Sequence, residues 1–369
     1  MKKNNEKPYL EFVGFCDQLE RAKKVYVTGG YAFVVSDNPI KLGDPEEPVR
    51  CTLYIINISD SKNPVLVSSF EAPGGLVDVS VKDNFVVLAE APVSKPKEKG
   101  KGYSRNQECG GVRILDISEP MKPHEVGFFH TDGFVQGCSI RNGLLYIVIK
   151  DSIIFAYLYI KNKLSIRGRL LVIDISKPEA MKEVGRLDSV HGFKRIFFYD
   201  NLAFIIANIN RDDYNEETDL CIIDTSEPTD LKEIKTIEHS EDDTDVFVDG
   251  GLAYLIQRGT NRDTSLTDWY YVHGGLRIID ISNIQNPKDI GWINEFNLEA
   301  VAPVGIIVVD KHAIIAHHSG LEIIDVGDPK NPISLGSYKT KGEPRSIFYN
   351  DGLIYIADDT NLGIYRLTT

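Results

Sequence analysis

One short phrase recurs seven times along the chain and constrains the fold more than any other feature. The phrase reads approximately Leu-x-Ile-Ile-Asp-Ile-Ser, and its copies begin at residues 53, 112, 170, 220, 276, 321 and 362. Neighbouring copies start 41 to 59 residues apart, which leaves room for one small unit of strands and loops in each repeat. The sequence therefore predicts seven similar units.

Each copy of the phrase follows a hairpin and precedes one more short strand. The hairpins are β-branched and aromatic runs that meet at two-residue turns, as in VSVKDNFVVLA and CSIRNGLLYIV. After the phrase comes a turn that often reads Ser-x-Pro, and then a strand such as HEVGFF or KDIGWI. We name the four strands A to D in chain order, so that the phrase is strand C. Repeated radially, they predict an all-β fold, a seven-bladed β-propeller of four-stranded antiparallel blades in a single domain over residues 1–369.

The two ends of the chain complement each other. The seventh unit, formed by about residues 342–369, stops after strand C, and YLEFVGF at residues 9–15 reads like a strand D with no A, B or C before it. We expect the N-terminal strand to pair into the last blade. This pairing closes the ring and covers an otherwise exposed sheet edge.

The phrase, with Gly-Leu and an Ala-Tyr or Ala-Phe strand before it, resembles the LVIVD-repeat β-propeller family. The resemblance extends through all seven units, and it implies the propeller fold. It implies no catalytic residues, because the motif of this family is structural. The tryptophan-aspartate pairs of WD40 repeats are missing from the sequence.

Composition excludes several classes of protein. The net charge of −13 argues against a nucleic-acid partner, and no apolar run is long enough for a membrane-spanning helix. Five widely spaced cysteines without a CxxC pair fit reduced thiols better than disulfides or a zinc site. The N-terminal residues contain no apolar segment typical of a secretory signal, so we expect a cytoplasmic protein. The alternative is an exported protein from which the signal has been removed.

The acidic residue of the phrase occupies the same position in most units. Such short polar side chains usually accept hydrogen bonds from backbone N–H groups in turns. Because nearly every unit uses the position, we expect it to be structural rather than catalytic. Its occupants are Asp116, Asp174, Asp224, Asp280 and Asp325, with Asn57 in a sixth unit.

The units differ mainly at one end of the predicted ring. The B–C connections of blades 2 to 5 are long (residues 91–111, 151–168, 210–219 and 258–275), whereas those of blades 6 and 7 are very short. Long loops on a rigid frame commonly carry binding sites. Neutral drift in tolerated insertions is the alternative explanation.

Polar residues at the starts of strands A and the ends of strands B suggest a site at the mouth of the channel. Strand A lines the channel, and its first residues carry opposite charges in different blades, which suits a polar or anionic small ligand. The alternative is that these groups line a water-filled channel. The predicted ligand-binding residues are Lys194, Arg195, His191, His317, Asp358, Arg345, Asp78 and Glu90.

Histidines concentrate at the same end, and those of separate blades can converge on a divalent metal ion. The alternative is a set of unrelated surface histidines, because no local ligand spacing such as HExxH is present. The candidate metal ligands are His191, His239, His317 and His318.

These observations favour a binding or interaction propeller that recognises a polar small molecule, a saccharide or a protein. The alternative is an enzyme, a metal-assisted lyase or hydrolase acting on a small polar or saccharide substrate at the channel mouth. The sequence contains no GxSxG, GxxxxGK[ST] or GxGxxG motif to decide for catalysis.

The blade 3 insertion is unusually apolar. Residues 152–166 read SIIFAYLYIKNKLSI, which predicts a projecting hairpin with an uncovered apolar face. Such a patch usually meets a partner, and a two-fold homodimer is the commonest solution. The alternative is a lid over the channel mouth.

Overall fold

The computed structural model describes residues 7–36, 51–91, 94–96, 103–105, 110–150, 168–209, 217–238, 242–258, 275–293 and 303–368. These residues form seven four-stranded antiparallel sheets and one small two-stranded sheet. The fold is the predicted all-β, seven-bladed β-propeller. The helical content of the described residues is a single 3₁₀ turn, η1 (Pro178–Ala180), and no helix among them is long and apolar enough to cross a membrane.

The blades follow one another in chain order. Blade 1 is β2 (Ala22–Thr28), β3 (Tyr31–Ser36), β4 (Cys51–Asn57) and β5 (Val65–Ala72); blade 2 is β6 (Gly75–Lys82), β7 (Phe85–Ala91), β10 (Gly111–Asp116) and β11 (His124–His130). Blade 3 is β12 (Phe134–Arg141), β13 (Leu144–Lys150), β14 (Gly168–Asp174) and β15 (Lys182–Ser189); blade 4 is β16 (Gly192–Tyr199), β17 (Leu202–Ile209), β18 (Glu217–Asp224) and β19 (Lys232–Ile237). Blade 5 is β20 (Asp242–Asp249), β21 (Leu252–Arg258), β22 (Gly275–Asp280) and β23 (Lys288–Ile293); blade 6 is β24 (Pro303–Val309), β25 (His312–His317), β26 (Gly320–Asp325) and β27 (Ile333–Tyr338). Blade 7 is β28 (Ser346–Asn350), β29 (Leu353–Asp358), β30 (Asn361–Thr368) and the N-terminal β1 (Tyr9–Cys16).

The chain divides into two compact units. One unit comprises residues 1–32, 56–66 and 241–369, and it contains blades 5 to 7 together with β2. The other comprises residues 33–55 and 67–240, and it contains blades 2 to 4. The strands of blade 1 are divided between the two units.

Tight turns join strands A and B because their residues adopt left-handed backbone conformations. In blade 3, Asn142 and Gly143 have φ values of 50° and 81°, and Asp83, Asp200, Asp310 and Asp351 have φ values of 49–54° in other blades. Two-residue hairpin turns with positive φ match the twist of the flanking strands, and Asn, Asp and Gly tolerate this conformation best.

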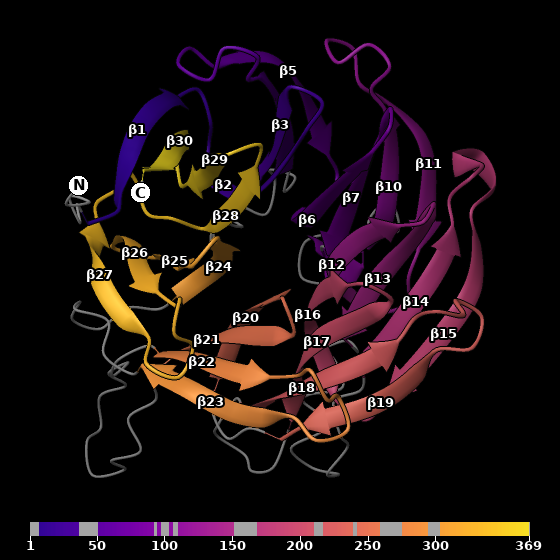
Figure 1. Ribbon diagram of the computed structural model, residues 1–369. Coiled ribbons are helices and arrows are strands. Elements are labelled where there is room, and N and C mark those ends of the chain that lie inside the picture. The colour runs from indigo at the N-terminus through magenta and orange to yellow at the C-terminus, as the bar shows by residue number, and fades with distance from the viewer. Residues whose placement is uncertain are drawn as a thin grey trace. The chain divides into compact units, whose positions relative to one another are not determined.

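The N-terminal strand closes the propeller as predicted. β1 pairs antiparallel with β30, from Tyr9 opposite Thr368 to Cys16 opposite Leu362 (Figure 1). Leu10 lies in a buried cluster with apolar residues of blades 6 and 7, including Ile323 and Ile356. The last blade therefore takes its outer strand from the opposite end of the chain.

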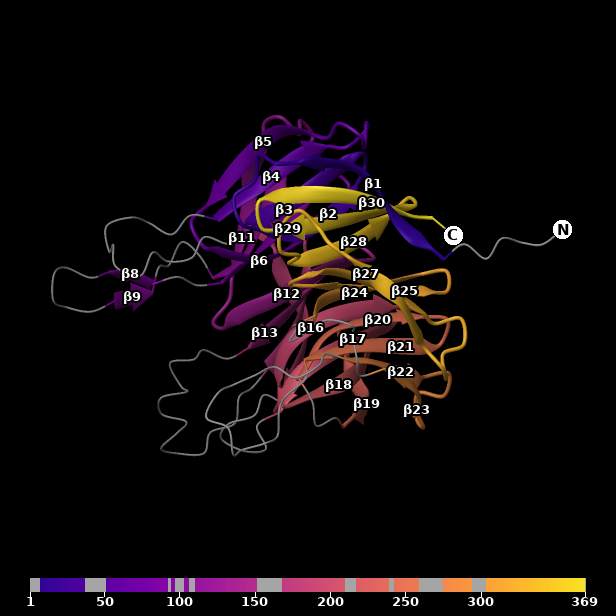
Figure 2. The same cartoon turned by 90° about the vertical axis from the view of Figure 1, so that its left-hand side faces the viewer.

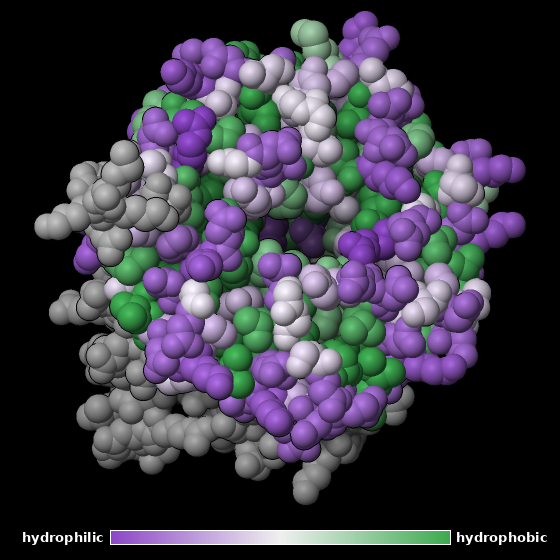
Figure 3. Space-filling model, viewed as in Figure 1, coloured by the Kyte–Doolittle hydropathy of each residue, from purple (hydrophilic) through white to green (hydrophobic). Residues whose placement is uncertain are grey.

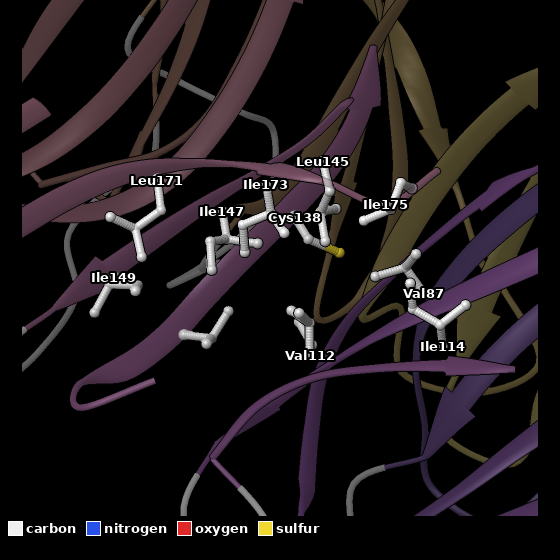
Figure 4. Packing of buried hydrophobic residues seen from close by; sticks show 12 residues of the cluster. Val87, Val112, Ile114, Cys138, Leu145, Ile147, Ile149, Leu171, Ile173 and Ile175 are labelled. Atoms are coloured by element: carbon white, nitrogen blue, oxygen red, sulfur yellow. The ribbon is translucent and has the colours of Figure 1, made fainter. Parts of the chain in front are cut away.

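Apolar side chains on both faces of the inner strands form the core between blades. Between blades 2 and 3, Val87 and Ile114 meet Leu145, Ile147 and Ile173, all fully buried (Figure 4). This packing explains why strands B and C lack the alternating apolar and polar pattern of a half-exposed sheet.

The fifth residue of the phrase, Asp in blades 2 to 6 and Asn57 in blade 1, accepts a hydrogen bond in the turn between strands C and D. Asp174 accepts a hydrogen bond from the backbone N–H of Ser176 (2.9 Å), and this bond lowers the pKa of its carboxyl group. Equivalent bonds to the residue two positions ahead are made by Asn57, Asp116, Asp224, Asp280 and Asp325. The position is structural, as the repeat predicted, although these turns lie at the surface.

A glycine in strand D allows the next blade to approach closely. A Cβ atom on Gly127, Gly185 or Gly291 would lie 1.8–1.9 Å from a proline carbonyl oxygen in the C–D turn of the following blade. Gly14 of β1 has the same relation, at 2.3 Å, to the Ser61 carbonyl of blade 1. Blades 7 and 1 therefore share the kind of backbone contact that joins blades 2 and 3, 3 and 4, and 5 and 6.

Most of the long connections lie outside the described residues. These include residue 239, the acidic segment 210–216, residues 259–274 and the whole of 152–166, so the predicted dimer or lid hairpin stays a prediction. In blade 2, β8 (Ser94–Pro96) pairs with β9 (Tyr103–Arg105), and this short hairpin projects beyond the blade (Figure 2).

Candidate functional site

Polar residues occupy equivalent, buried positions at the ends of strands B. The residue opposite the start of strand C is Glu90 in blade 2, Gln257 in blade 5, His317 in blade 6 and Asp358 in blade 7, and all four are at most 1% exposed. Three of them belong to consecutive blades of one compact unit. Buried polar groups are costly, so three successive blades with such groups mark this end of blades 5 to 7 as a candidate site.

In blade 5, the inner polar groups pair within the blade. Gln257 donates from Nε2 to Oδ1 of the buried Asp243 (2.8 Å). Arg258 lies next to them at the end of β21, and its guanidinium is 3.7 Å from the Asp242 carboxylate.

In blade 6, His317 is held in one tautomer. The backbone N–H of Ser319 donates to His317 Nδ1 (3.2 Å), so in the neutral ring the proton is on Nε2. Burial, with the neighbouring charge of His318, lowers the pKa of His317 to about 4, and the ring is therefore neutral at physiological pH. Its Nε2 atom is buried and has no hydrogen-bond partner in the described part of the chain.

In blade 7, Asp358 shows the opposite shift. Burial raises its pKa to about 6, against the effects of the Gly342 N–H, which donates to Asp358 Oδ2 (3.2 Å), and of the Asn361 side chain opposite it on β30. The other carboxyl oxygen, Oδ1, is buried without a hydrogen-bond partner among the described residues.

The crossover from blade 6 to blade 7, residues 339–345, contacts Asp358 and His318 and carries charged groups. Its Gly342 contacts Asp358, and the carboxylate of its Glu343 lies 3.3 Å from both His318 Nδ1 and Arg345 Nη2. Burial lowers the pKa of His318, and Glu343 opposes this shift while Arg345 and Arg258 add to it. The rim of the site thus spans blades 5 to 7. We call the whole group the blade 5–7 polar cluster: Asp242, Asp243, Gln257, Arg258, His317, His318, Gly342, Glu343, Arg345 and Asp358.

Of the predicted ligand-binding residues, the structure brings together His317, Arg345 and Asp358. The remaining ones, Asp78, Glu90, His191, Lys194 and Arg195, belong to the other compact unit. Gly342 and Glu343 were not predicted. The only signal in the sequence was the short charged segment Lys-Gly-Glu-Pro-Arg before the last hairpin.

Strand A contains a β-bulge near its start in five blades, and the bulge accounts for two of the predicted residues. The bulge residues are Val77, Gln136, Lys194, Thr244 and Val304. Asp78, directly after its bulge, accepts a hydrogen bond from Cys138 N of the next blade (3.0 Å), and Asp245 bonds Ile306 N in the same way (3.3 Å). Asp78 therefore links two blades, and Lys194 occupies a bulge.

Glu90 also has a structural partner. Arg113 donates to both carboxylate oxygens of Glu90 (2.5 and 3.1 Å), bonds Glu125 and lies over the Phe128 ring. Burial raises the pKa of Glu90 even though the hydrogen bonds and charge of Arg113 act in the opposite direction.

The predicted metal ligands do not form a cluster in the described structure. His317 and His318 are adjacent, His191 belongs to the other unit, and residue 239 lies outside the described residues. No group of three or more His, Cys, Asp or Glu side chains in the described ranges is arranged to hold a metal ion. The tautomer of His317 also does not suit a metal, because a ligating histidine normally donates from its other ring nitrogen instead of accepting there.

Comparison with known proteins agrees with this architecture. Among solved structures, the chain is similar to BamB from Moraxella catarrhalis (TM-score 0.57, 9% identity, 97% of this chain and 98% of that one). It is also similar to the WD40 β-propeller domain of Doa1 (TM-score 0.58, 11% identity, 97% of each chain) and to a functionally unknown protein from Desulfotomaculum acetoxidans (TM-score 0.56, 13% identity, 93% and 94%). At these identities the likeness concerns the fold alone. The protein is thus a β-propeller of the class that these structures share.

The repeats agree with a known family. The LVIVD repeat matches residues 21–40, 108–131, 156–189, 268–293 and 304–340. The chain thus carries LVIVD repeats along its length, as its repeated phrase predicted, and its blades are consistent with the LVIVD-repeat β-propeller family. No curated protein matches the chain.

Proposed function

We propose that this protein is a binding propeller and that the blade 5–7 polar cluster recognises a polar ligand. The observation that carries the proposal is the pair His317 and Asp358, which hold unpartnered polar atoms at equivalent positions in adjacent blades. A buried polar atom without a hydrogen bond costs about 1–3 kcal/mol. Two such atoms beside a charged rim are explained if a ligand supplies the missing partners.

The exposed surface supports polar rather than apolar recognition. Among the described residues, exposed large apolar side chains are spread over the blades, and only blade 7 carries more than one: Tyr9, Phe12 and Tyr349. Hydrophilic and hydrophobic residues are also mixed over the face with the C–D turns, which is the one shown in Figure 3 and lies opposite the long connections. A large continuous apolar patch would instead favour a protein partner.

A thermal-shift screen of the purified protein tests the proposal. The panel contains neutral saccharides and polyols, inorganic phosphate, and Ca²⁺ and Zn²⁺. We expect one class to raise the melting temperature of the wild type, and the Glu343→Ala/Arg345→Ala double variant to reduce that rise. His312→Leu, at the opposite end of β25, is the matched control and should respond like the wild type. If a probe raises the melting temperature of the wild type, the double variant and His312→Leu equally, it binds outside the blade 5–7 polar cluster.

A second candidate function rests on the carboxyl group of Asp358. A pKa of about 6 suits a general acid or base near neutral pH, which is the property that the alternative enzyme would need. If a ligand of the panel is chemically altered by the wild type and left intact by Asp358→Asn, the protein is an enzyme. Binding without turnover favours the binding propeller.

A further inference from the structure

The inner layer of the blade 5–7 polar cluster offers one donor and one acceptor. His317 and Asp358 are 0% and 1% exposed, and their Nε2 and Oδ1 atoms have no partner among the described residues. Their positions in β25 and β29 are equivalent. Asp358 contacts Gly342 of the crossover 339–345, and His318, the residue after His317, contacts Glu343 of the same segment. The chemistry of these two atoms limits what a ligand can be.

His317 can only donate at Nε2. Since Nδ1 accepts from the Ser319 N–H, the Nε2 atom carries the proton of the neutral ring. A metal ion would need the lone pair that this proton occupies. An anion would gain a hydrogen bond but no charge pairing, because the ring is neutral.

Asp358 supplies the complementary group. Its Oδ2 atom is used by Gly342 N (3.2 Å), which leaves Oδ1 to accept from a ligand donor. An anionic ligand would meet the like charge of this carboxylate whenever it is ionised. The inner layer therefore disfavours anions as well as metals.

The charged residues at the rim of the cluster do not change this preference against anions and metal ions. Arg345 and His318 both contact the carboxylate of Glu343, and Arg258 lies near that of Asp242. Each guanidinium thus has an acidic side chain beside it. A rim with paired charges gives orientation and hydrogen bonds rather than a strong attraction for one sign of charge.

We propose that the ligand of the blade 5–7 polar cluster is an uncharged, hydroxyl-bearing molecule of the saccharide or polyol class, held by His317 Nε2 and Asp358 Oδ1. The inference rests on the proposed function and names its ligand. A hydroxyl group both accepts and donates, so hydroxyls can satisfy both atoms without bringing charge into the buried layer. Because both atoms are covered, a ligand can reach them only when part of the cover moves, and Gly342 of the crossover 339–345 is the part that contacts Asp358.

Binding measurements on the full chain test the ligand class. Neutral mono- and disaccharides and linear polyols are titrated against the wild type, with inorganic phosphate, Ca²⁺ and Zn²⁺ as charged probes, and dissociation constants are measured by NMR. We expect a neutral probe to bind, and His317→Leu to weaken it by about tenfold or more, as the loss of one buried hydrogen bond predicts. His317→Gln keeps an N–H donor and should stay within about threefold of the wild type.

Controls separate the two proposals. Asp358→Leu should weaken the neutral ligand as His317→Leu does, and His312→Leu should leave it unchanged. Melting curves of every variant confirm folding, and His317→Ala or Asp358→Ala, which also remove the polar atom, replace a leucine variant that does not fold. If only phosphate or a metal binds, and Arg345→Ala weakens it, the cluster is a binding site but the ligand class is wrong. If a neutral probe binds regardless of His317 and Asp358, the inference fails. If no probe of any class depends on the cluster, both proposals fail.

Discussion

Burial shifts the pKa values of His317 and Asp358, which occupy equivalent positions in adjacent blades, in opposite directions. In each case burial favours the uncharged form. His317 loses affinity for a proton because its charged form is the protonated one, whereas Asp358 gains affinity because its charged form is the deprotonated one. The blade 5–7 polar cluster therefore has an inner layer that resists charge beneath a charged rim.

The stability of the protein should show the Asp358 shift directly. Its pKa is about 6 in the folded protein against an ordinary value of 3.8, so the folded state binds this proton more tightly. The contribution is complete below pH 3.8 and is lost as pH rises through 6, by up to about 3 kcal/mol. Asp358→Asn should therefore gain stability relative to the wild type between pH 4 and pH 7. Urea unfolding at both values measures this.

His317 provides the reciprocal control. Its pKa is lowered from 6.5 to about 4, so its contribution is present above pH 6.5 and is lost as pH falls through 4. His317→Gln should therefore gain relative to the wild type on acidification. If both variants follow the wild-type pH profile, the two groups are not buried as the structure shows.

At the scale of strands, the side chain of the second residue of the phrase forms hydrogen bonds with side chains of strand D in three blades. Arg113 bonds Glu125 in blade 2, and Arg277 bonds Asp289 in blade 5 (2.5 and 2.9 Å). In blade 6 the polarity is reversed, because Glu322 accepts from the hydroxyls of Ser334 and Ser337. In these three blades the second residue of the phrase is thus matched to strand D of its own blade, which agrees with the variation of this position among the copies.

The N-terminal strand should carry a large share of the stability of blade 7. Leu10 is buried against residues of blades 6 and 7, so Leu10→Ala should lower the free energy of unfolding by about 2–4 kcal/mol. Glu11, whose ion pair with Arg366 is half exposed, is the matched control on the same strand. Glu11→Ala should change the free energy by less than about 1 kcal/mol. Equal losses for both variants in urea unfolding would contradict the closure by packing.

The strand D glycines should not tolerate a side chain. In Gly185→Ala the new Cβ would lie 1.8 Å from the Pro228 carbonyl oxygen, so blades 3 and 4 must separate, at about 1–3 kcal/mol. Lys235 occupies the same register in blade 4 and already has a Cβ, so Lys235→Ala should change stability by less than about 0.5 kcal/mol. Thermal unfolding of the two variants compares them, and a Gly185→Ala protein that melts like the wild type would rule out the close contact.

The sequence predicted the elements that repeat and not the contacts that differ. The phrase gave the blades, the closing strand and the structural role of Asp174, because each rests on periodicity or local turn chemistry. It also predicts His317 and Asp358 as ligand-binding residues, because both are polar at the end of an apolar strand, and that role stays a prediction. Their burial, and the roles of Gly342 and Glu343, depend on where a crossover crosses two other strands. Local patterns do not contain that information. For the same reason, the sequence predicts Asp78 as a ligand-binding residue but not its hydrogen bond to the next blade.

At the scale of the whole molecule, the way the chain closes leaves one repeat contact unmade. The strand D glycines of blades 2, 3 and 5, and Gly14 of β1, receive a carbonyl from the next C–D turn. Gly336 of blade 6, whose φ is 144°, instead has no described atom within 4 Å of an added Cβ. The next blade has no such turn, because its strand C is β30 and its strand D is β1, from opposite ends of the chain. The closure thus costs the propeller one contact between blades.

Restoring that turn should stabilise the protein. Residues 116–124 form the C–D turn of blade 2, and they span the same register as the gap between Tyr365 and Phe12. In a backbone-cyclised chain with this turn grafted between Tyr365 and Phe12, a proline carbonyl should seat against Gly336. The control is a cyclised chain with a Gly/Ser linker of equal length. The chain with the grafted turn should melt a few degrees higher than this control, because the new contact adds about 1 kcal/mol to the free energy of unfolding. Cyclisation itself reduces the entropy of the unfolded chain in both proteins, so the difference isolates the new contact. Equal melting temperatures of the two cyclised chains would show that Gly336 is not a vacant member of the series.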